Sequence, residues 1–274
     1  MTNWRRGALL LLMVAGVLTA PAFAQTEGEV KQSAASDARA ILKRMGDFLA
    51  ATPALSVKVR AGYDVVQESG QKVEFGDLVT YTLRRPDRFR VEGQKSSGEK
   101  GFILFDGKEI VAMGAGAKVY AATSKPGTVQ EAIPYMVSDL ELEIPLALLF
   151  VSSVGSDMLE GVESADYVET DFLMGLPCDH IAARTETVDF QLWIAQGDRP
   201  LPQRIVLLYK DEPGEPQFRG QFLEWNLKPD VSDSVFAFTP PPGAERVRFL
   251  TEVEKELEGA KPTSKASGKK GGKR

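Results

Sequence analysis

The chain has 274 residues, 43% of them hydrophobic, with 33 basic and 38 acidic residues. Residues 261–274 hold six of the basic residues and no acidic one, and the first 24 residues hold two, so residues 25–260 carry 25 basic against 38 acidic residues. An acidic body of this size excludes a nucleic-acid-binding groove, which requires a concentrated positive field.

The first 24 residues have the pattern of a secretory signal peptide. Two arginines precede an apolar run over residues 8–18, and an A-x-A cleavage pattern ends at Ala24. The run is shorter than the roughly 20 residues that span a bilayer. We therefore expect cleavage after Ala24 and an exported protein that starts at Gln25, which has no thiol for lipidation. Residues 25–32 are expected to be flexible.

The clearest helix is expected over residues 33–53. Apolar side chains recur there at the i, i+3, i+4, i+7 spacing of one helical face, and charged side chains occupy the other face. The apolar face consists of Ala38, Ile41, Leu42, Met45, Phe48 and Leu49. A single apolar stripe predicts a helix that lies across another part of the protein.

Most of the remaining chain alternates as short strands with turn residues between them, which indicates consecutive antiparallel pairing. The expected strands cover residues 57–65, 71–84, 87–92, 101–105, 109–113, 165–170, 176–184, 188–195, 203–210, 217–227 and 236–238. Helical segments are expected at 128–137 and 145–151, and a short polar helix at 251–260. The basic tail, residues 261–274, is expected to be disordered. It either keeps the protein soluble or makes peripheral contact with an anionic membrane.

Together these elements predict an α+β fold with one domain over residues 33–250. A sheet of about ten to eleven strands tends to curl. Its concave face needs a cover, and the N-terminal amphipathic helix and the apolar segment at 145–151 can supply it. The expected architecture is a curved antiparallel half-barrel with a helical lid.

The segment GLPCDHIA (175–182) contains the only cysteine and the only histidine of the chain. Cys178 and His180 share one face of a strand. A cysteine nucleophile also needs a base in contact and an orienting group, and a zinc site needs three or four ligands. Because these parts and the common catalytic motifs are missing, we expect no enzyme, no cofactor and no metal site. The pair is expected to pack on the sheet, or to contact a ligand if its face lines a cavity.

An apolar run in the second helical segment suggests a lid over a hydrophobic ligand. Leu146, Leu149 and Phe150 are the expected lid contacts, and Phe89 and Trp193 are expected to line the same cavity from the sheet. The alternative is that these side chains are ordinary core.

Arg88 and Arg90 share one face of the strand that carries Phe89 and Val91 on its other face. They are expected to form a polar mouth that meets lipid head groups or a partner's carboxylates. The alternative is a solvated face over buried Phe89 and Val91.

Several motifs resemble known families. RRPDRFRVE (84–92) resembles the "RPxRFR" strand of the LolA/LolB-like lipoprotein carriers, as does DFQLWIAQGDRPLPQRIVLLYKD (189–211). Over residues 38–249 the chain resembles more closely the predicted periplasmic proteins of the bacterial family called domain of unknown function 2092. The matching stretches are AILKRMGDFLA, RRPDRFRVE, LFDGKEI, GTVQEAI, IPLALLF, GLPCDHIAAR, FQLWIAQGDRPLPQRIV and FAFTPPPGAERVRF.

The resemblance implies an incomplete barrel with a helical lid, a periplasmic location and no catalytic residues. Two features depart from it, because Gln25 replaces the lipidated cysteine of the outer-membrane receptor and the basic tail lies outside the pattern. The expected function is non-enzymatic binding of a lipid, an acyl chain or another hydrophobic molecule in the cell envelope. The alternative is a regulatory or assembly module that binds an envelope protein partner.

Overall fold

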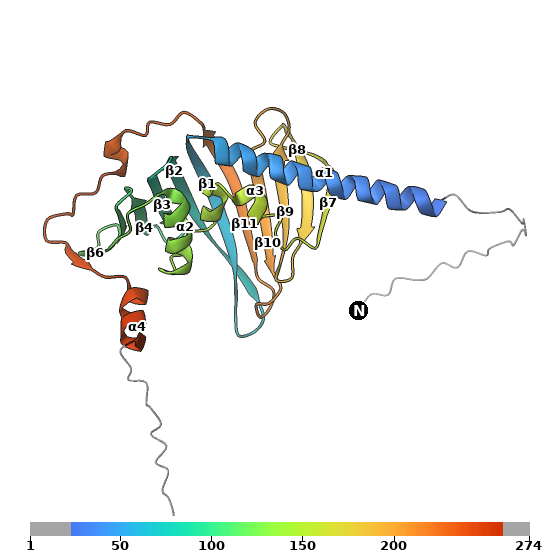
Figure 1. Ribbon diagram of the computed structural model, residues 1–274. Coiled ribbons are helices and arrows are strands. Elements are labelled where there is room, and N and C mark those ends of the chain that lie inside the picture. The colour runs from blue at the N-terminus through green and yellow to red at the C-terminus, as the bar shows by residue number, and fades with distance from the viewer. Residues whose placement is uncertain (1–22, 260–274) are drawn as a thin grey trace, which may run out of the picture.

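A twelve-stranded curved sheet organises the protein (Figure 1). The computed structural model describes residues 23–259, with side chains from residue 37 to residue 256. The spatial order is β12-β6-β5-β4-β3-β2-β1-β11-β10-β9-β8-β7, and every neighbouring pair is antiparallel except β12 with β6. The strands are β1 (Ala54–Val66), β2 (Lys72–Arg84), β3 (Arg88–Lys95), β4 (Lys100–Phe105), β5 (Glu109–Gly114), β6 (Val119–Ser124), β7 (Ser164–Leu173), β8 (Leu176–Arg184), β9 (Val188–Ala195), β10 (Pro202–Tyr209), β11 (Gln217–Asn226) and β12 (Glu245–Val247).

This confirms the expected α+β fold with a curved antiparallel sheet, but the strand count is higher than expected. The sequence did not indicate β6 or β12, and β12 has only three residues, too few to show an alternation. The strand expected at 236–238 is wrong. The 3₁₀ helix η2 (Asp233–Phe236) ends there, and the prolines at 240–242, which lack an N–H, follow it.

Helix α1 (Phe23–Ala51) crosses the concave face of the sheet (Figure 1). Its apolar stripe is fully buried at Leu42, Met45 and Leu49. The helix begins at Phe23, before the expected start at residue 33. It includes residues 25–32, which were expected to be flexible. No proline interrupts this stretch, so the helix can continue through it. Most of the expected signal peptide and all of the basic tail lie outside the described residues.

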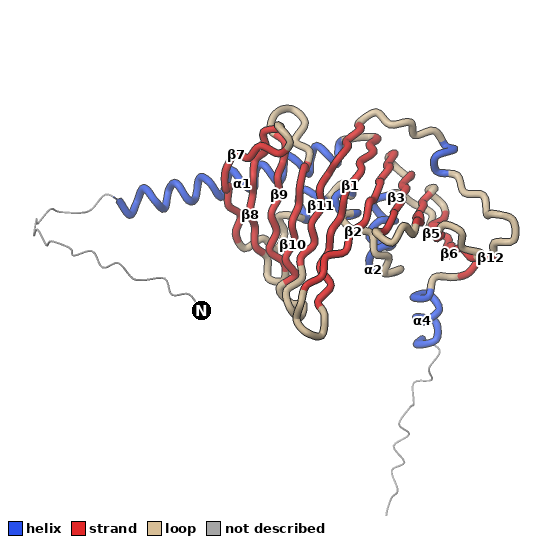
Figure 2. Tube along the Cα trace, turned by 180° about the vertical axis from the view of Figure 1, so that it is seen from behind, coloured by secondary structure: helices blue, strands red, loops and turns tan. Residues whose placement is uncertain are grey.

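Three further helical pieces lie on the same face as α1: α2 (Val129–Ser138), η1 (Ala147–Phe150) and α3 (Val154–Asp157). Figure 2, seen from behind, shows the strands in front of all of them. We call residues 140–157 the lid, and they supply the cover that the sequence predicted. Within the described residues, no helix is long and apolar enough to cross a membrane.

Residues 227–244, which we call the strap, lie against the convex face. Arg84 donates hydrogen bonds to the carbonyl of Val231 at 2.7 Å and to the carboxylate of Asp233 at 2.6 Å. Phe236 of the strap is 2% exposed, with the Arg84 guanidinium 5.5 Å from its ring centre. The strap leads to β12 and to the short helix α4 (Leu250–Gly259).

Candidate functional site

A row of glycines removes side chains from part of the concave face. Gly93 of β3 lies opposite Gly101 of β4, which lies opposite Gly114 of β5. These positions alternate with Gln94, Phe102 and Met113, which point to the convex face. A Cβ added at Gly93 would meet no atom within 4 Å. The concave surface is therefore open at Gly93, whereas a Cβ at Gly101 would lie 3.2 Å from the carbonyl oxygen of Met113.

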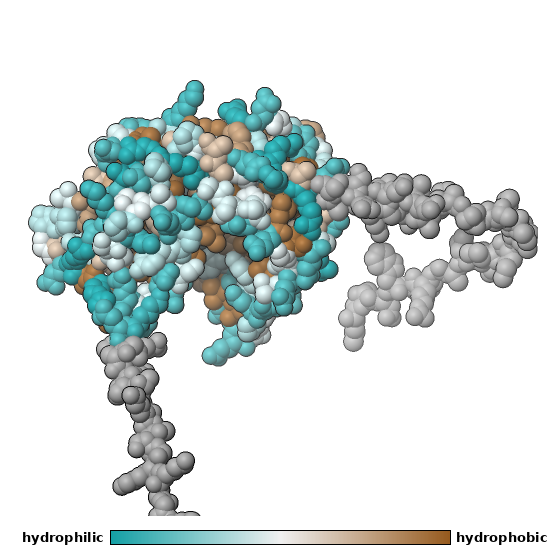
Figure 3. Space-filling view, viewed as in Figure 1, coloured by the Kyte–Doolittle hydropathy of each residue, from teal (hydrophilic) through white to brown (hydrophobic). Residues whose placement is uncertain are grey.

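The glycine row is the floor of a cavity of about 660 Å³, which we call the glycine groove. The lid contributes Glu143 and Pro145 to its wall. Its apolar lining on the sheet side includes Val79, Val91, Ile103, Ala112, Val119, Ala121 and Val247. Figure 3 shows that the helix-covered face is hollowed and that hydrophobic residues lie inside the hollow. Apolar walls around an open concave space are typical of small-molecule sites.

Charged side chains line the groove at the C-terminal end of β3 and beside it on β2. Asp77 of β2 lies opposite Lys95 of β3, and Lys95 forms an ion pair with Glu99 at 3.5 Å. Burial raises the pKa of the Asp77 carboxyl; Lys95 opposes this shift, and Glu143 adds to it. The charged part of the groove thus contains a carboxyl group that is less easily ionised than one in water.

Polar contacts attach the lid to the sheet and to α1. The Tyr81 hydroxyl donates to the carbonyl of Pro145. The Arg85 guanidinium donates to the carbonyls of Phe150 at 2.8 Å, Thr52 at 3.2 Å and Leu49 at 3.3 Å, and burial lowers the pKa of Arg85. These bonds satisfy carbonyls at the end of α1 and hold Phe150 in place.

Four of the expected ligand contacts lie on the concave side. Phe89 and Phe150 are 0% and 1% exposed, with ring centres 6.1 Å apart, and Leu149 is buried in the same core. Leu146 has a left-handed backbone (φ 61°) and packs against the core near Gly220. None of the four is among the residues that line the glycine groove. These four side chains pack in or against the hydrophobic core beside the groove.

Trp193 lies on the convex face, which corrects its expected place in the cavity. Its ring stacks on His180 at 4.1 Å, and its Nε1 donates to Asp171 at 2.9 Å. The neighbouring Leu192 and Ile194 point into the core. Strand alternation places Trp193 on the opposite face from Leu192 and Ile194. It does not show which of the two faces the helices cover.

Arg88 and Arg90 also lie on the convex face, so they do not form a mouth of the concave cavity. Arg90 pairs with Glu92 at 2.9 Å and lies over the Phe102 ring at 5.0 Å, under the strap. Arg88 pairs with its neighbour Asp87 at 2.9 Å. The predicted burial of Phe89 and Val91 on the other face agrees with the structure.

Cys178 and His180 share the convex face of β8. Cys178 is fully buried, and burial raises the pKa of its thiol, which opposes formation of a nucleophilic thiolate. The His180 Nε2 lies 3.0 Å from the Gln191 side-chain oxygen. Among the described residues, no group of His, Cys, Asp and Glu side chains is arranged to hold a metal.

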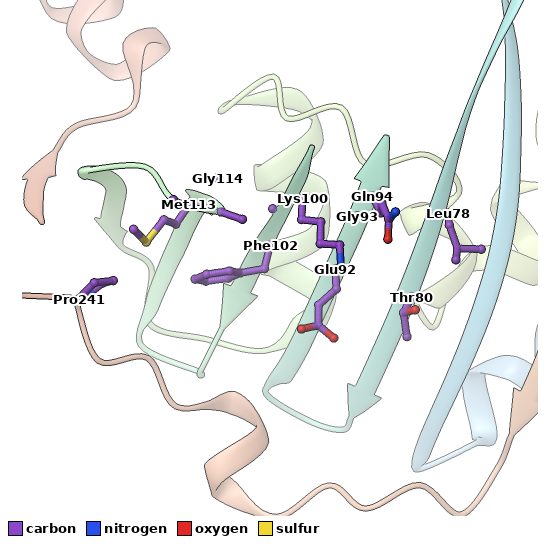
Figure 4. Close-up of a pocket in the computed structure, with 13 residues that line it drawn as sticks. Leu78, Thr80, Glu92, Gly93, Gln94, Lys100, Phe102, Met113, Gly114 and Pro241 are labelled. Carbon is purple, nitrogen blue, oxygen red and sulfur yellow. The ribbon is translucent and has the colours of Figure 1, made fainter. Parts of the chain in front are cut away.

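A second cavity of about 490 Å³ lies on the convex face, behind the glycine row (Figure 4). Leu78, Thr80, Glu92 and Pro241 line this cavity and not the glycine groove. The residues that line both cavities are Gly93, Gln94, Lys100, Gly101, Phe102, Met113, Gly114 and Ala115. The sheet is therefore only one backbone thick between the two spaces. The convex cavity lacks the helical cover and lies beside the strap.

Sequence reasoning missed the glycine row. The available signal was isolated glycines inside three strand patterns, at positions 93, 101 and 114, because glycine in a strand marks close approach by another group or an unfilled space. Their alignment depends on strand register, which the sequence did not establish.

Searches for similar solved structures return proteins of low identity. An uncharacterised conserved protein from Thermus thermophilus has 16% identity and a TM-score of 0.46, covering 77% of this chain and 99% of that one. The Mycobacterium tuberculosis lipoprotein LppX has 13% identity and a TM-score of 0.45, covering 72% and 99%. A chain of the Pseudomonas aeruginosa MucA/MucB complex has 16% identity and a TM-score of 0.42, covering 74% of this chain and 61% of that one.

A search of curated proteins gives no match to the chain. A family profile described as a predicted periplasmic protein (DUF2092) matches residues 38–250, which include the whole curved sheet, the lid and α1 from Ala38 onward. The match confirms the resemblance inferred from the motifs. The chain belongs to the DUF2092 family of predicted periplasmic proteins.

Proposed function

We propose that the protein binds an apolar chain, such as an acyl chain, in the glycine groove. The observation that carries this proposal is the row of Gly93, Gly101 and Gly114 beneath an apolar cavity of about 660 Å³. The volume falls within the roughly 300–1,000 Å³ of small-molecule sites. Each buried methylene of a ligand contributes about 0.8 kcal/mol, so a long chain gains affinity along the groove.

The lid controls access in this proposal. Glu143 and Pro145 form one wall of the groove, and the lid is held through the Tyr81 and Arg85 hydrogen bonds described above. A ligand enters when this wall moves away from the sheet, and closure excludes water from the apolar lining. The groups placed at the groove serve binding, and the proposal includes no catalytic step.

The proposal places this binding outside the cytoplasm. The signal-peptide pattern ending at Ala24 directs export, and the family description is periplasmic. The mature protein then begins at Gln25 and works as a binding protein of the envelope.

Filling the groove tests the proposal. Gly93→Phe places a ring in open space without backbone strain, because Gly93 has no left-handed φ. Binding of Nile red, a neutral apolar dye, followed by fluorescence, should weaken at least tenfold. Val206→Phe, which places the same aromatic ring on the convex side of β10, is the control and should leave binding unchanged. Equal binding by wild type and Gly93→Phe would contradict the proposal.

A further inference from the structure

We infer that the glycine groove selects amphiphiles whose head group is an ammonium ion. This inference rests on the proposed function, because it assigns the head group of the ligand whose chain lies in the groove. Asp77 of β2 and Glu143 of the lid both line the cavity, one from each wall. An apolar chain in the groove therefore has its polar end beside two carboxylates.

Neither carboxylate has a partner within the described residues. All ion pairs and side-chain hydrogen bonds of β2 around this point involve other groups, and Lys95, opposite Asp77, is paired with Glu99. Lys100 also borders the cavity, but its strand position points to the convex face, two residues before Phe102. Asp77 and Glu143 thus line the groove without a direct ion-pair partner, although Lys95, which pairs with Glu99, acts on Asp77 through space.

Electrostatics then ranks the possible head groups. Burial disfavours the ionised form of Asp77 in the empty groove and raises its pKa; Lys95 opposes this shift, and repulsion from Glu143 adds to it. An ammonium ion relieves this repulsion and donates hydrogen bonds to carboxylate oxygens. A carboxylate or phosphate head adds a third negative charge, and a hydroxyl adds none.

Three amphiphiles with the same twelve-carbon chain separate the effect of the head group on affinity from that of the chain. They are dodecylamine, dodecanol and dodecanoate. Each is titrated below its micelle concentration at pH 7 against the purified full-length mature chain, with Nile red displacement as the readout. The expected order is dodecylamine first, at least tenfold tighter than dodecanol, and dodecanoate weakest. The preference should fall as salt is added, because the charged end of the groove is open to solvent.

Charge-removing variants locate the effect. Asp77→Asn combined with Glu143→Gln should bring dodecylamine to within threefold of dodecanol, because both carboxylates that would meet the ammonium ion are then uncharged. Glu74→Gln is the control, since Glu74 lies on the same strand, points to the other face and pairs with Arg219. It removes one negative charge from the acidic surface and should keep the tenfold preference.

Different outcomes would overturn the head-group inference and the proposed chain binding. Equal affinity for the three amphiphiles, or a preference for dodecylamine that persists in the double variant, overturns the head-group inference. Neither result contradicts binding of the apolar chain in the groove. Failure of all three to bind, with Nile red binding unaffected by Gly93→Phe, overturns the proposed function itself.

Discussion

Arg85 joins the C-terminal end of α1 to the lid through three carbonyl oxygens. Replacing it with glutamine leaves those half-buried carbonyls without a charged donor. We expect Arg85→Gln to lower the free energy of unfolding by about 2 kcal/mol, as for hydrogen bonds that involve a charged group. Urea denaturation measures this. Arg60→Gln, at an exposed arginine of β1, is the control, and an equal loss in both variants would show that the contacts of Arg85 add nothing.

Asp77 should make stability depend on pH in an unusual direction for a carboxyl group. Its pKa is raised above the ordinary value of 3.8, so the folded protein disfavours the ionised form. The resulting penalty is complete above the raised pKa and disappears as pH falls below 3.8. Asp77→Asn should therefore be more stable than wild type at pH 7 and equal to it at pH 3. Thermal unfolding at both pH values measures the difference, and a less stable variant at pH 7 would reverse the sign.

At the scale of elements, α1 and α3 cross at two glycines. A Cβ at Gly46 would overlap the backbone of Gly155. Alanine in place of glycine normally stabilises a helix by about 1 kcal/mol. We expect Gly46→Ala to do the opposite, with a loss of about 2 kcal/mol from overpacking and a displaced lid. Unfolding by denaturant measures the sign, with the exposed Ala40→Gly as the propensity control. A rise in stability for Gly46→Ala would show that the crossing is not tight.

Buried Phe236 and the two Arg84 hydrogen bonds are among the contacts that hold the strap on the convex face. Truncating a buried phenylalanine typically removes about 3–5 kcal/mol. Phe236→Ala should release the strap and accelerate proteolysis between residues 228 and 244. Nile red binding should remain, because the glycine groove opens on the other face. Proteolysis mapped by mass spectrometry measures the first effect, and loss of dye binding would place the ligand on the convex side.

At the scale of the whole molecule, sequence patterns predicted the elements better than the site. Alternation and turn residues predicted most strands, and the spacing of Leu42, Met45 and Leu49 predicted the covering helix. Alternation also placed Cys178 with His180, and Arg88 with Arg90, on shared faces. It did not decide whether a face is concave or convex, which is why Trp193 and the two arginines were placed at the cavity.

The groove depends on information that a single strand does not contain. Gly93, Gly101 and Gly114 are eight and thirteen residues apart in sequence, and only the register of β3, β4 and β5 brings them into one row. Register is a property of paired strands and their turns. The apolar residues that sequence reasoning selected, Phe89 and Phe150, fill the core next to the groove instead, because large side chains close a space rather than leave it open.

The central claim is that an apolar chain lies in the glycine groove, on the concave side of the sheet. A fatty alcohol with a photoreactive diazirine on its chain, bound and irradiated, marks the residues it touches, and mass spectrometry identifies them. The account predicts labels on Val91, Ala121 and Val247, which line the groove. Labels confined to Leu78 and Pro241, which line the convex cavity, would contradict it.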